Sequence, residues 1–188
     1  MRPLLEDEAG DPAAVTRDYQ LDLDAEQAPL LTVWGGKITT FRKLAEEAAD
    51  LLAPALPEMR GAWTRAAMFP GGDLSAFIGA PRRPDTDFVR FVQALALRHP
   101  TVPEPLVHRL ARAYGTRAAK LLEKGIGAEI APGVHDGELR HLVEREWART
   151  ADDVLWRRSK LGLHLGAGGR EAVAAWMAEV DTQPAVFR

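Results

Sequence analysis

The chain contains no cysteine. Disulfide frameworks, thiolate nucleophiles and cysteine-containing metal sites are therefore excluded, and the absence fits a reducing cytoplasm. The chain also lacks a strong excess of one charge, because 24 Lys and Arg stand against 27 Asp and Glu, for a formal net charge of -3. Since the arginines alternate with acids instead of forming a basic run, we expect no nucleic-acid partner.

Long apolar runs are also missing: no stretch supplies the roughly 20 apolar residues of a membrane span. Acidic residues stand near the amino terminus, where a secretory signal would place its apolar segment. The five histidines form no metal-binding motif, and the chain has no P-loop, no nucleophile elbow and no dinucleotide-binding fingerprint. With 46% hydrophobic residues, the chain is expected to be globular, soluble and cytoplasmic.

Residues 1–60 are predicted to hold two strands and a helix. Polar and apolar residues alternate over 16–23, and 30–34 is a short β-favouring run that ends at a glycine pair, so these two segments are predicted to form a hairpin. Over 38–55 the apolar period changes to three and four residues, which predicts an amphipathic helix.

Residues 61–87 are rich in Gly and Pro and are predicted to be a linker. Beyond it, helical spacing recurs in six segments, which are 88–98, 103–114, 116–124, 136–148, 150–163 and 168–181. The predicted fold class is therefore mainly α. It has an amino-terminal β-hairpin and helix in 1–60, followed by an all-helical domain in 88–188.

The segment 35–42 is the most informative one chemically. Gly35 and Gly36 permit unusual dihedral angles, Lys37 adds a positive charge, and the N–H groups of the next turn are donors for an anion or a carbonyl. An ordinary turn with a solvated lysine is the alternative, and from this segment alone it is the more common case. Arg2 and Arg17 are further candidates for gripping phosphate, although each by itself is typical of a surface cation.

The segment 144–161 combines charges with two tryptophans. Thr150 and Asp153 have the spacing of a helix-capping pair, and Asp153 and Arg157 lie one helical turn apart. We interpret this segment as a salt-bridge network that holds helices together, in preference to a catalytic group.

Several segments, taken in order, resemble the aerobic, FAD-dependent glycerol-3-phosphate dehydrogenases. The last part of the catalytic region of that family is similar to residues 2–4, 16–19 and 30–45. Its helical carboxyl-terminal domain is similar to residues 63–64, 70–72, 114–115 and 144–163. The resemblance covers nearly the whole chain.

The resemblance implies an enzyme that oxidises sn-glycerol 3-phosphate to dihydroxyacetone phosphate, reduces bound FAD and passes electrons to quinone. Members are peripheral to the cytoplasmic membrane and often dimeric. By position, the residues near the substrate phosphate and the reacting end correspond to Arg2, Arg17 and Lys37. The segment along the pyrimidine edge of the flavin corresponds to Gly36, Lys37, Ile38 and Thr39.

The family also has a Gly-rich βαβ unit for the ADP half of FAD and a histidine candidate for the base, and neither is in this sequence. The resemblance therefore implies a carboxyl-terminal fragment that neither retains FAD nor turns over substrate without the missing amino-terminal FAD domain. The alternative is that the helical half is a non-catalytic interaction or oligomerisation module.

Overall fold

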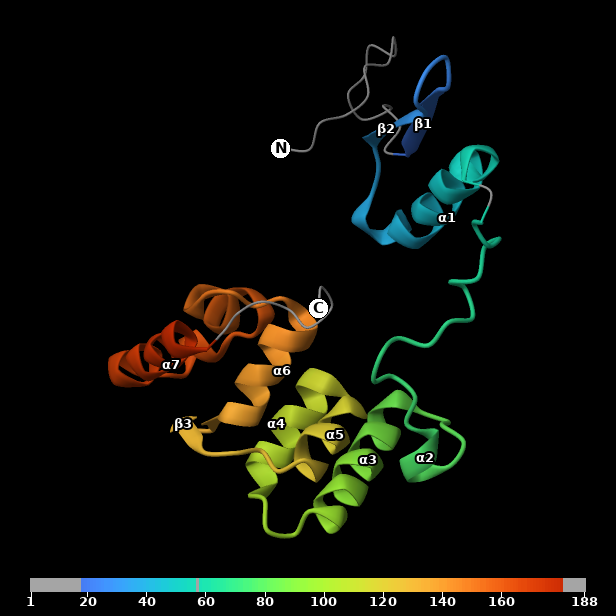
Figure 1. Ribbon diagram of the computed structural model, residues 1–188. Helices are drawn as coiled ribbons and strands as arrows, with labels where there is room; N and C mark the ends of the chain where they lie inside the picture. Colours follow the sequence, from blue (N-terminus) through green and yellow to red (C-terminus); the bar gives the residue numbers. More distant parts are fainter. Residues whose placement is uncertain (1–17, 57, 181–188) are drawn as a thin grey trace, which may run out of the picture. The chain divides into compact units, whose positions relative to one another are not determined.

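The computed structural model describes residues 18–56 and 58–180 (Figure 1). The chain divides into two compact units, Met1–Ala67 and Met68–Arg188. The boundary between the units falls inside the range 61–87 that the sequence indicates as a linker.

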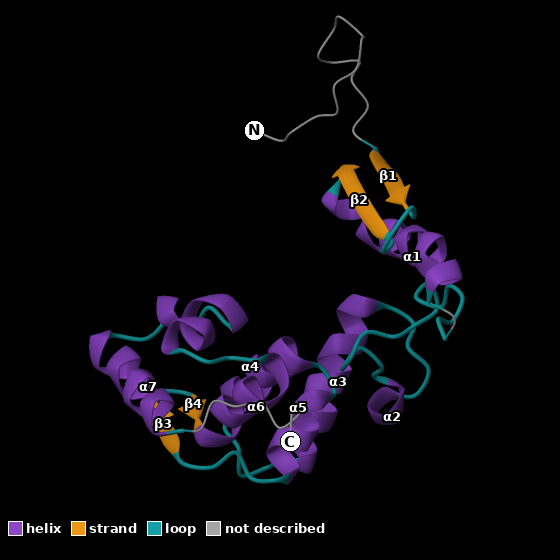
Figure 2. Cartoon of the chain, turned by 45° about the horizontal axis from the view of Figure 1, so that its top comes forward, coloured by secondary structure: helices purple, strands orange, loops and turns teal. Residues whose placement is uncertain are grey.

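The first unit contains an antiparallel hairpin followed by a helix, as the sequence predicts. Tyr19 lies opposite Gly35 in the hairpin, and Leu23 lies opposite Leu31. Figure 2 shows the two strands in orange beside the helix. The elements are β1 (Tyr19–Asp24), β2 (Leu30–Gly35), the 3-10 turn η1 (Ile38–Thr40), α1 (Phe41–Leu52) and the 3-10 turn η2 (Ala53–Ala55).

The second unit is mainly helical, which confirms the predicted fold class. In chain order its elements are α2 (Ser75–Ile78), α3 (Pro84–Arg98), α4 (Glu104–Tyr114), α5 (Arg117–Glu123), β3 (Glu129–Ala131), β4 (Val134–His135), α6 (Asp136–Glu146), the π-helix η3 (Asp153–Arg158), the 3-10 turn η4 (Leu161–Leu163) and α7 (Ala167–Glu179). The short β3–β4 hairpin was not predicted. Over 18–56 and 58–180, no helix combines the length and the apolar character needed to cross a membrane.

The core of the second unit follows from the apolar spacing of its helices. On α3, Phe91 and Leu95 are one turn apart and fully buried. The helix begins where the buried carboxylate of Asp87 accepts hydrogen bonds from the backbone N–H groups of Arg82 and Arg83, at 2.5 and 2.6 Å. Burial raises the pKa of Asp87, but these donors, together with the neighbouring Arg90, outweigh it and hold the pKa below its ordinary value.

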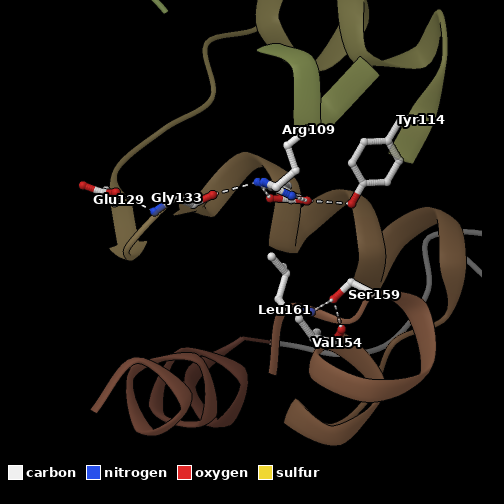
Figure 3. Close-up of polar contacts among 8 residues, drawn as sticks. Arg109, Tyr114, Glu129, Gly133, Val154, Ser159 and Leu161 are labelled. Carbon is white, nitrogen blue, oxygen red and sulfur yellow. Dashed lines mark hydrogen bonds and ion pairs between the residues drawn. The ribbon is translucent and has the colours of Figure 1, made fainter. Parts of the chain in front are cut away.

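The range 150–163, predicted as one helix, is a π-helix followed by a 3-10 turn. Ser159 explains the break, because both its N–H and its hydroxyl donate to the carbonyl of Val154, five residues back. Its hydroxyl oxygen also accepts from the N–H of Leu161, at 3.2 Å (Figure 3). A regular helix would pair that carbonyl four residues on, so the side chain of Ser159 ends the helix.

Candidate functional site

The turn between β2 and α1 has two successive glycines in conformations that other residues rarely adopt. Gly35 has φ +70° and Gly36 has φ +100°. A Cβ placed on Gly36 would lie 3.4 Å from the Cβ of Tyr19, which is ordinary van der Waals contact. The backbone angle therefore requires glycine at position 36, and crowding does not.

Lys37 continues the turn in an extended conformation. Its carbonyl oxygen accepts hydrogen bonds from both the N–H and the hydroxyl of Thr40, at 3.1 and 2.9 Å. These bonds close η1 and leave the side chains of Lys37, Ile38 and Thr39 exposed. The first N–H groups of a helical turn have no acceptor within it, so donors lie beside the lysine cation.

The turn is bordered by apolar side chains that are open to solvent. Trp34 is 50% exposed, Ile38 79% and Phe41 59%. Over residues 18–56 and 58–67, no residue is buried. The turn is thus an accessible edge that carries one cation and free N–H donors between apolar side chains.

Strand β1, in which Tyr19 lies opposite Gly35, is tied to α1 by a hydrogen bond. The hydroxyl of Tyr19 donates to Oε2 of Glu47 at 2.5 Å, and Nζ of Lys43 lies 3.1 Å from Oε1 of the same carboxylate. The bond to Glu47 raises the pKa of Tyr19 to about 12. In turn, the bond from Tyr19, followed by that from Lys43, lowers the pKa of Glu47.

The neighbouring glutamate ties α1 to the segment that follows it. Oε1 of Glu46 accepts from the N–H and the hydroxyl of Thr64, at 3.1 and 2.5 Å, and Oε2 pairs with Arg42 at 2.8 Å. The pKa of Glu46 is lowered chiefly by the bond from the Thr64 hydroxyl. Glu46 and Glu47 therefore anchor the same helix to different parts of the unit.

Of the residues predicted to bind substrate or cofactor, the structure places Gly36, Lys37, Ile38 and Thr39 in this one turn. Arg2 and Arg17 lie outside the described residues. Their part in a phosphate site therefore stays a prediction.

The second unit contains a buried polar cluster (Figure 3). Glu138 of α6 is fully buried, and Arg109 of α4 donates to both of its oxygens, at 2.7 and 2.6 Å. The hydroxyl of Tyr114 donates to the same carboxylate at 2.8 Å, and Arg109 also donates to the carbonyl of Gly133 at 2.7 Å. Burial, and then the charge of Glu138, raise the pKa of Tyr114.

This cluster is structural. Its carboxylate, guanidinium and phenol bind one another, and they join α4, α6 and the β3–β4 hairpin, which satisfies the buried carboxylate. The sequence reasoning missed it, because Arg109 and Glu138 are 29 residues apart. The available signal was the position of Glu138, which lies one helical turn from the buried Leu142 on the apolar face of α6.

The capping pair predicted in 144–161 is confirmed. Asp153 accepts from the N–H and hydroxyl of Thr150, both at 3.0 Å, and its own N–H donates back to that hydroxyl. Arg157 pairs with Asp153 at 2.9 Å, as predicted. These bonds, led by one from the N–H of Arg149, lower the pKa of Asp153 to about 2.

By its fold, the second unit belongs to the class of small helical domains, here built around a buried ion pair. Residues 62–183 match the family model of the C-terminal domain of alpha-glycerophosphate oxidase. The chain therefore belongs to this family.

Curated relatives extend the similarity into the first unit. D-erythritol 1-phosphate dehydrogenase of Brucella abortus (strain 2308) is 42% identical over 182 residues, which are 94% of this chain and 34% of the relative. Aerobic glycerol-3-phosphate dehydrogenase of Escherichia coli (strain K12) is 39% identical over 190 residues, 97% of this chain and 36% of the relative. Glycerol-3-phosphate dehydrogenase of Pseudomonas aeruginosa is 42% identical over 172 residues, which are 88% of this chain and 32% of the relative. The chain spans about a third of the length of these relatives, and its resemblance to the carboxyl-terminal portion of the family is confirmed.

Proposed function

We propose that this chain is the carboxyl-terminal portion of an FAD-dependent glycerol-3-phosphate dehydrogenase. The whole enzyme oxidises sn-glycerol 3-phosphate to dihydroxyacetone phosphate and passes the electrons to quinone at the cytoplasmic membrane, where it is peripheral. The observation that carries the proposal is the open turn at Lys37, in a unit whose similarity to the dehydrogenases runs through the same residues.

The residues of the turn fit one edge of a flavin. Two glycines let the backbone approach a ring closely, and the N–H donors of η1 suit its carbonyl groups. When bound, the flavin supplies the acceptor for the hydride that leaves the alcohol carbon. Lys37 and the helical N–H groups hold positive potential at the edge where reduced flavin is negatively charged. Arg2, Arg17 and Lys37 are proposed to surround the substrate phosphate.

The chain by itself is proposed to be inactive. The ADP half of FAD requires a Gly-rich βαβ unit, and the histidine candidate for the base comes from the amino-terminal region of the family; this sequence contains neither. The amino-terminal FAD domain is therefore the necessary partner, and FAD is not retained without it.

The erythritol phosphate relative raises a second candidate substrate. It is 42% identical to this chain, as is the Pseudomonas aeruginosa glycerol-3-phosphate dehydrogenase, so identity does not separate the two substrates. Both substrates named by these relatives are phosphorylated polyols, so the same cationic turn suits either.

The test uses the chain alone and a hybrid in which it replaces the matching third of the Escherichia coli relative. The hybrid is expected to retain flavin, seen in its visible absorbance, and to reduce a dye with sn-glycerol 3-phosphate. D-erythritol 1-phosphate is the parallel substrate, and faster reduction with it would assign the enzyme to the second candidate. The chain alone is expected to be colourless and inactive.

Two results would reject the proposal: flavin retention and turnover by the chain alone, or a folded hybrid that binds no flavin. Self-association of the chain by light scattering, together with a flavin-free hybrid, would support the alternative of a non-catalytic oligomerisation module.

A further inference from the structure

We infer that Tyr19 and Glu47 are positioning residues, and that their hydrogen bond sets the orientation of the turn Gly35–Gly36–Lys37 toward the flavin. This inference rests on the proposed function. Neither residue is placed in contact with flavin or substrate, and both act through the turn.

Tyr19 lies against the turn at both of its glycines. It is the hairpin partner of Gly35, and its Cβ is the nearest heavy atom to the position that a Cβ on Gly36 would take, at 3.4 Å. The two residues that reverse the chain are therefore paired with or packed against Tyr19. A displacement of this side chain moves the support of the turn.

The hydroxyl of Tyr19 reaches past the turn to the helix beyond it. Glu47 lies in the second turn of α1, and the 2.5 Å bond to its Oε2 connects β1 to α1. Only η1 separates Lys37 from α1. The bond therefore closes a ring of β1, turn and helix, and the turn is held at both ends.

Lys43 orients the carboxylate of Glu47 for this bond. Its ammonium occupies Oε1 of Glu47 at 3.1 Å, from one helical turn away, which leaves Oε2 for Tyr19. The phenol of Tyr19 therefore binds an acceptor whose orientation is already fixed. Since Tyr19 is also the hairpin partner of Gly35, the position of Glu47 affects the position of the turn.

The chain contains a matched control in the adjacent pair. The hydroxyl of Thr64 donates to Oε1 of Glu46 at 2.5 Å. Glu46 pairs with Arg42 one helical turn away, just as Glu47 pairs with Lys43. The bond from Thr64 anchors α1 to the segment after it and does not touch the turn. Tyr19→Phe and Thr64→Val each remove one hydroxyl that binds a glutamate of α1, with little change in volume.

The first experiment measures amide hydrogen exchange in the 188-residue chain by NMR. The reporter is the N–H of Thr40, which closes the turn on the carbonyl of Lys37. Tyr19→Phe is expected to speed its exchange by a factor of about 10 to 100, the effect of losing one hydrogen bond to a charged group, while Thr64→Val leaves it unchanged. Equal effects of the two variants, or an unprotected Thr40 in the wild type, would overturn the inference.

The second experiment measures the flavin potential, kcat and KM in the hybrid enzyme. Tyr19→Phe is expected to lower the potential and to reduce kcat several-fold with KM little changed, because the turn no longer faces the reduced ring correctly. Thr64→Val is expected to preserve all three values. If the hybrid binds flavin and Tyr19→Phe leaves its potential unchanged, the positioning role is wrong while the proposed function stands. A hybrid without flavin rejects the proposed function instead, and the exchange of Thr40 then decides whether Tyr19 holds the turn.

Discussion

Lys37 is an exposed cation that forms no ion pair with any other residue that the structure describes, whereas Lys43 is paired with Glu47. Neighbouring N–H donors and a positive charge on the same turn favour an anion there. A phosphate oxygen that accepts from Lys37 makes a charge-assisted hydrogen bond, which is stronger than a bond between neutral groups.

Lys37→Ala in the hybrid enzyme is therefore expected to raise KM for the phosphorylated polyol by a factor of about 10 to 100, since such a bond contributes about 1.5–3 kcal/mol. Lys124→Ala, which removes an exposed lysine of the second unit, is the control and should leave KM unchanged. Steady-state dye reduction measures both. Equal KM values in the two variants would exclude Lys37 from the phosphate site.

The Arg109–Glu138 pair predicts unequal costs for removing its two members. The side chain of Glu138 is fully buried, whereas that of Arg109 is 30% exposed. Arg109→Met leaves a buried carboxylate without its cation, and is expected to lower the free energy of unfolding by about 3–5 kcal/mol. Glu138→Gln keeps an acceptor for Tyr114 and lets Arg109 turn to water, at a cost of about 1–2 kcal/mol. Urea denaturation measures both, and a larger loss in Glu138→Gln would contradict the account.

At the level of elements, the segment before α2 is held against the end of α4 by a contact between Gly71 and Gly115. Gly71 has φ +84° and Gly115 has φ +55°, and the N–H of Thr116 donates to the carbonyl of Gly71 at 2.9 Å. A Cβ on Gly115 would lie 2.0 Å from that carbonyl oxygen. The segment before α2 is thereby fixed to the end of α4.

Gly115→Ala is expected to destabilise the second unit far more than Gly125→Ala. Gly125 also has a positive φ, +77°, but no heavy atom within 4 Å of an added Cβ, so its cost is the backbone strain of about 1–2 kcal/mol. At Gly115 a backbone clash adds to the same strain. Thermal unfolding followed by circular dichroism compares the two variants, and similar midpoints would show that the contact between Gly71 and Gly115 does not stabilise the unit.

The sequence predicts elements whose pattern is local and long. The alternation of Tyr19, Leu21 and Leu23 predicted β1, and the buried spacing of α3 was equally readable. The pair β3–β4 escaped because it is two to three residues per strand and depends on contact with α7. The π-helix η3 was not predicted, because its hydrogen bonds span five residues, as from the N–H of Ser159 to the carbonyl of Val154, and the apolar spacing of the sequence does not distinguish it from an α-helix. In the candidate site, the cationic turn was readable from its glycines, but the bond between Tyr19 and Glu47 spans 28 residues and was not.

For the whole molecule, burial differs sharply between the two units. All buried apolar side chains among the described residues belong to the second unit, and they form one cluster that runs from Phe91 to Met177. Cooperative unfolding requires such a core. We therefore expect the main unfolding transition of the chain to belong to the second unit.

The segment around α2 is packed against the core of the second unit, so the folded part of that unit begins before residue 88. Leu74, Phe77 and Ile78 pack against the core, and the ring of Phe77 meets that of Phe91 edge-on with centroids 5.0 Å apart. The guanidinium of Arg98 lies over the Phe77 ring, 4.1 Å from its centroid. Residues 68–87 therefore contribute apolar contacts to the helical domain.

A fragment of residues 68–188 is expected to unfold with the stability of the whole chain. The fragment 88–188 is expected to lose about 2 kcal/mol or more, because it lacks the partly buried ring of Phe77 and also the contacts made by Gly71 and Asp87. Phe77→Ala in the whole chain should reproduce part of that loss, because it removes the same ring and keeps the contacts of Gly71 and Asp87. Urea denaturation of all four proteins gives the comparison. If 88–188 were as stable as 68–188, the segment 61–87 would be a linker in the energetic sense as well, and the contacts of Phe77 would add nothing to the domain.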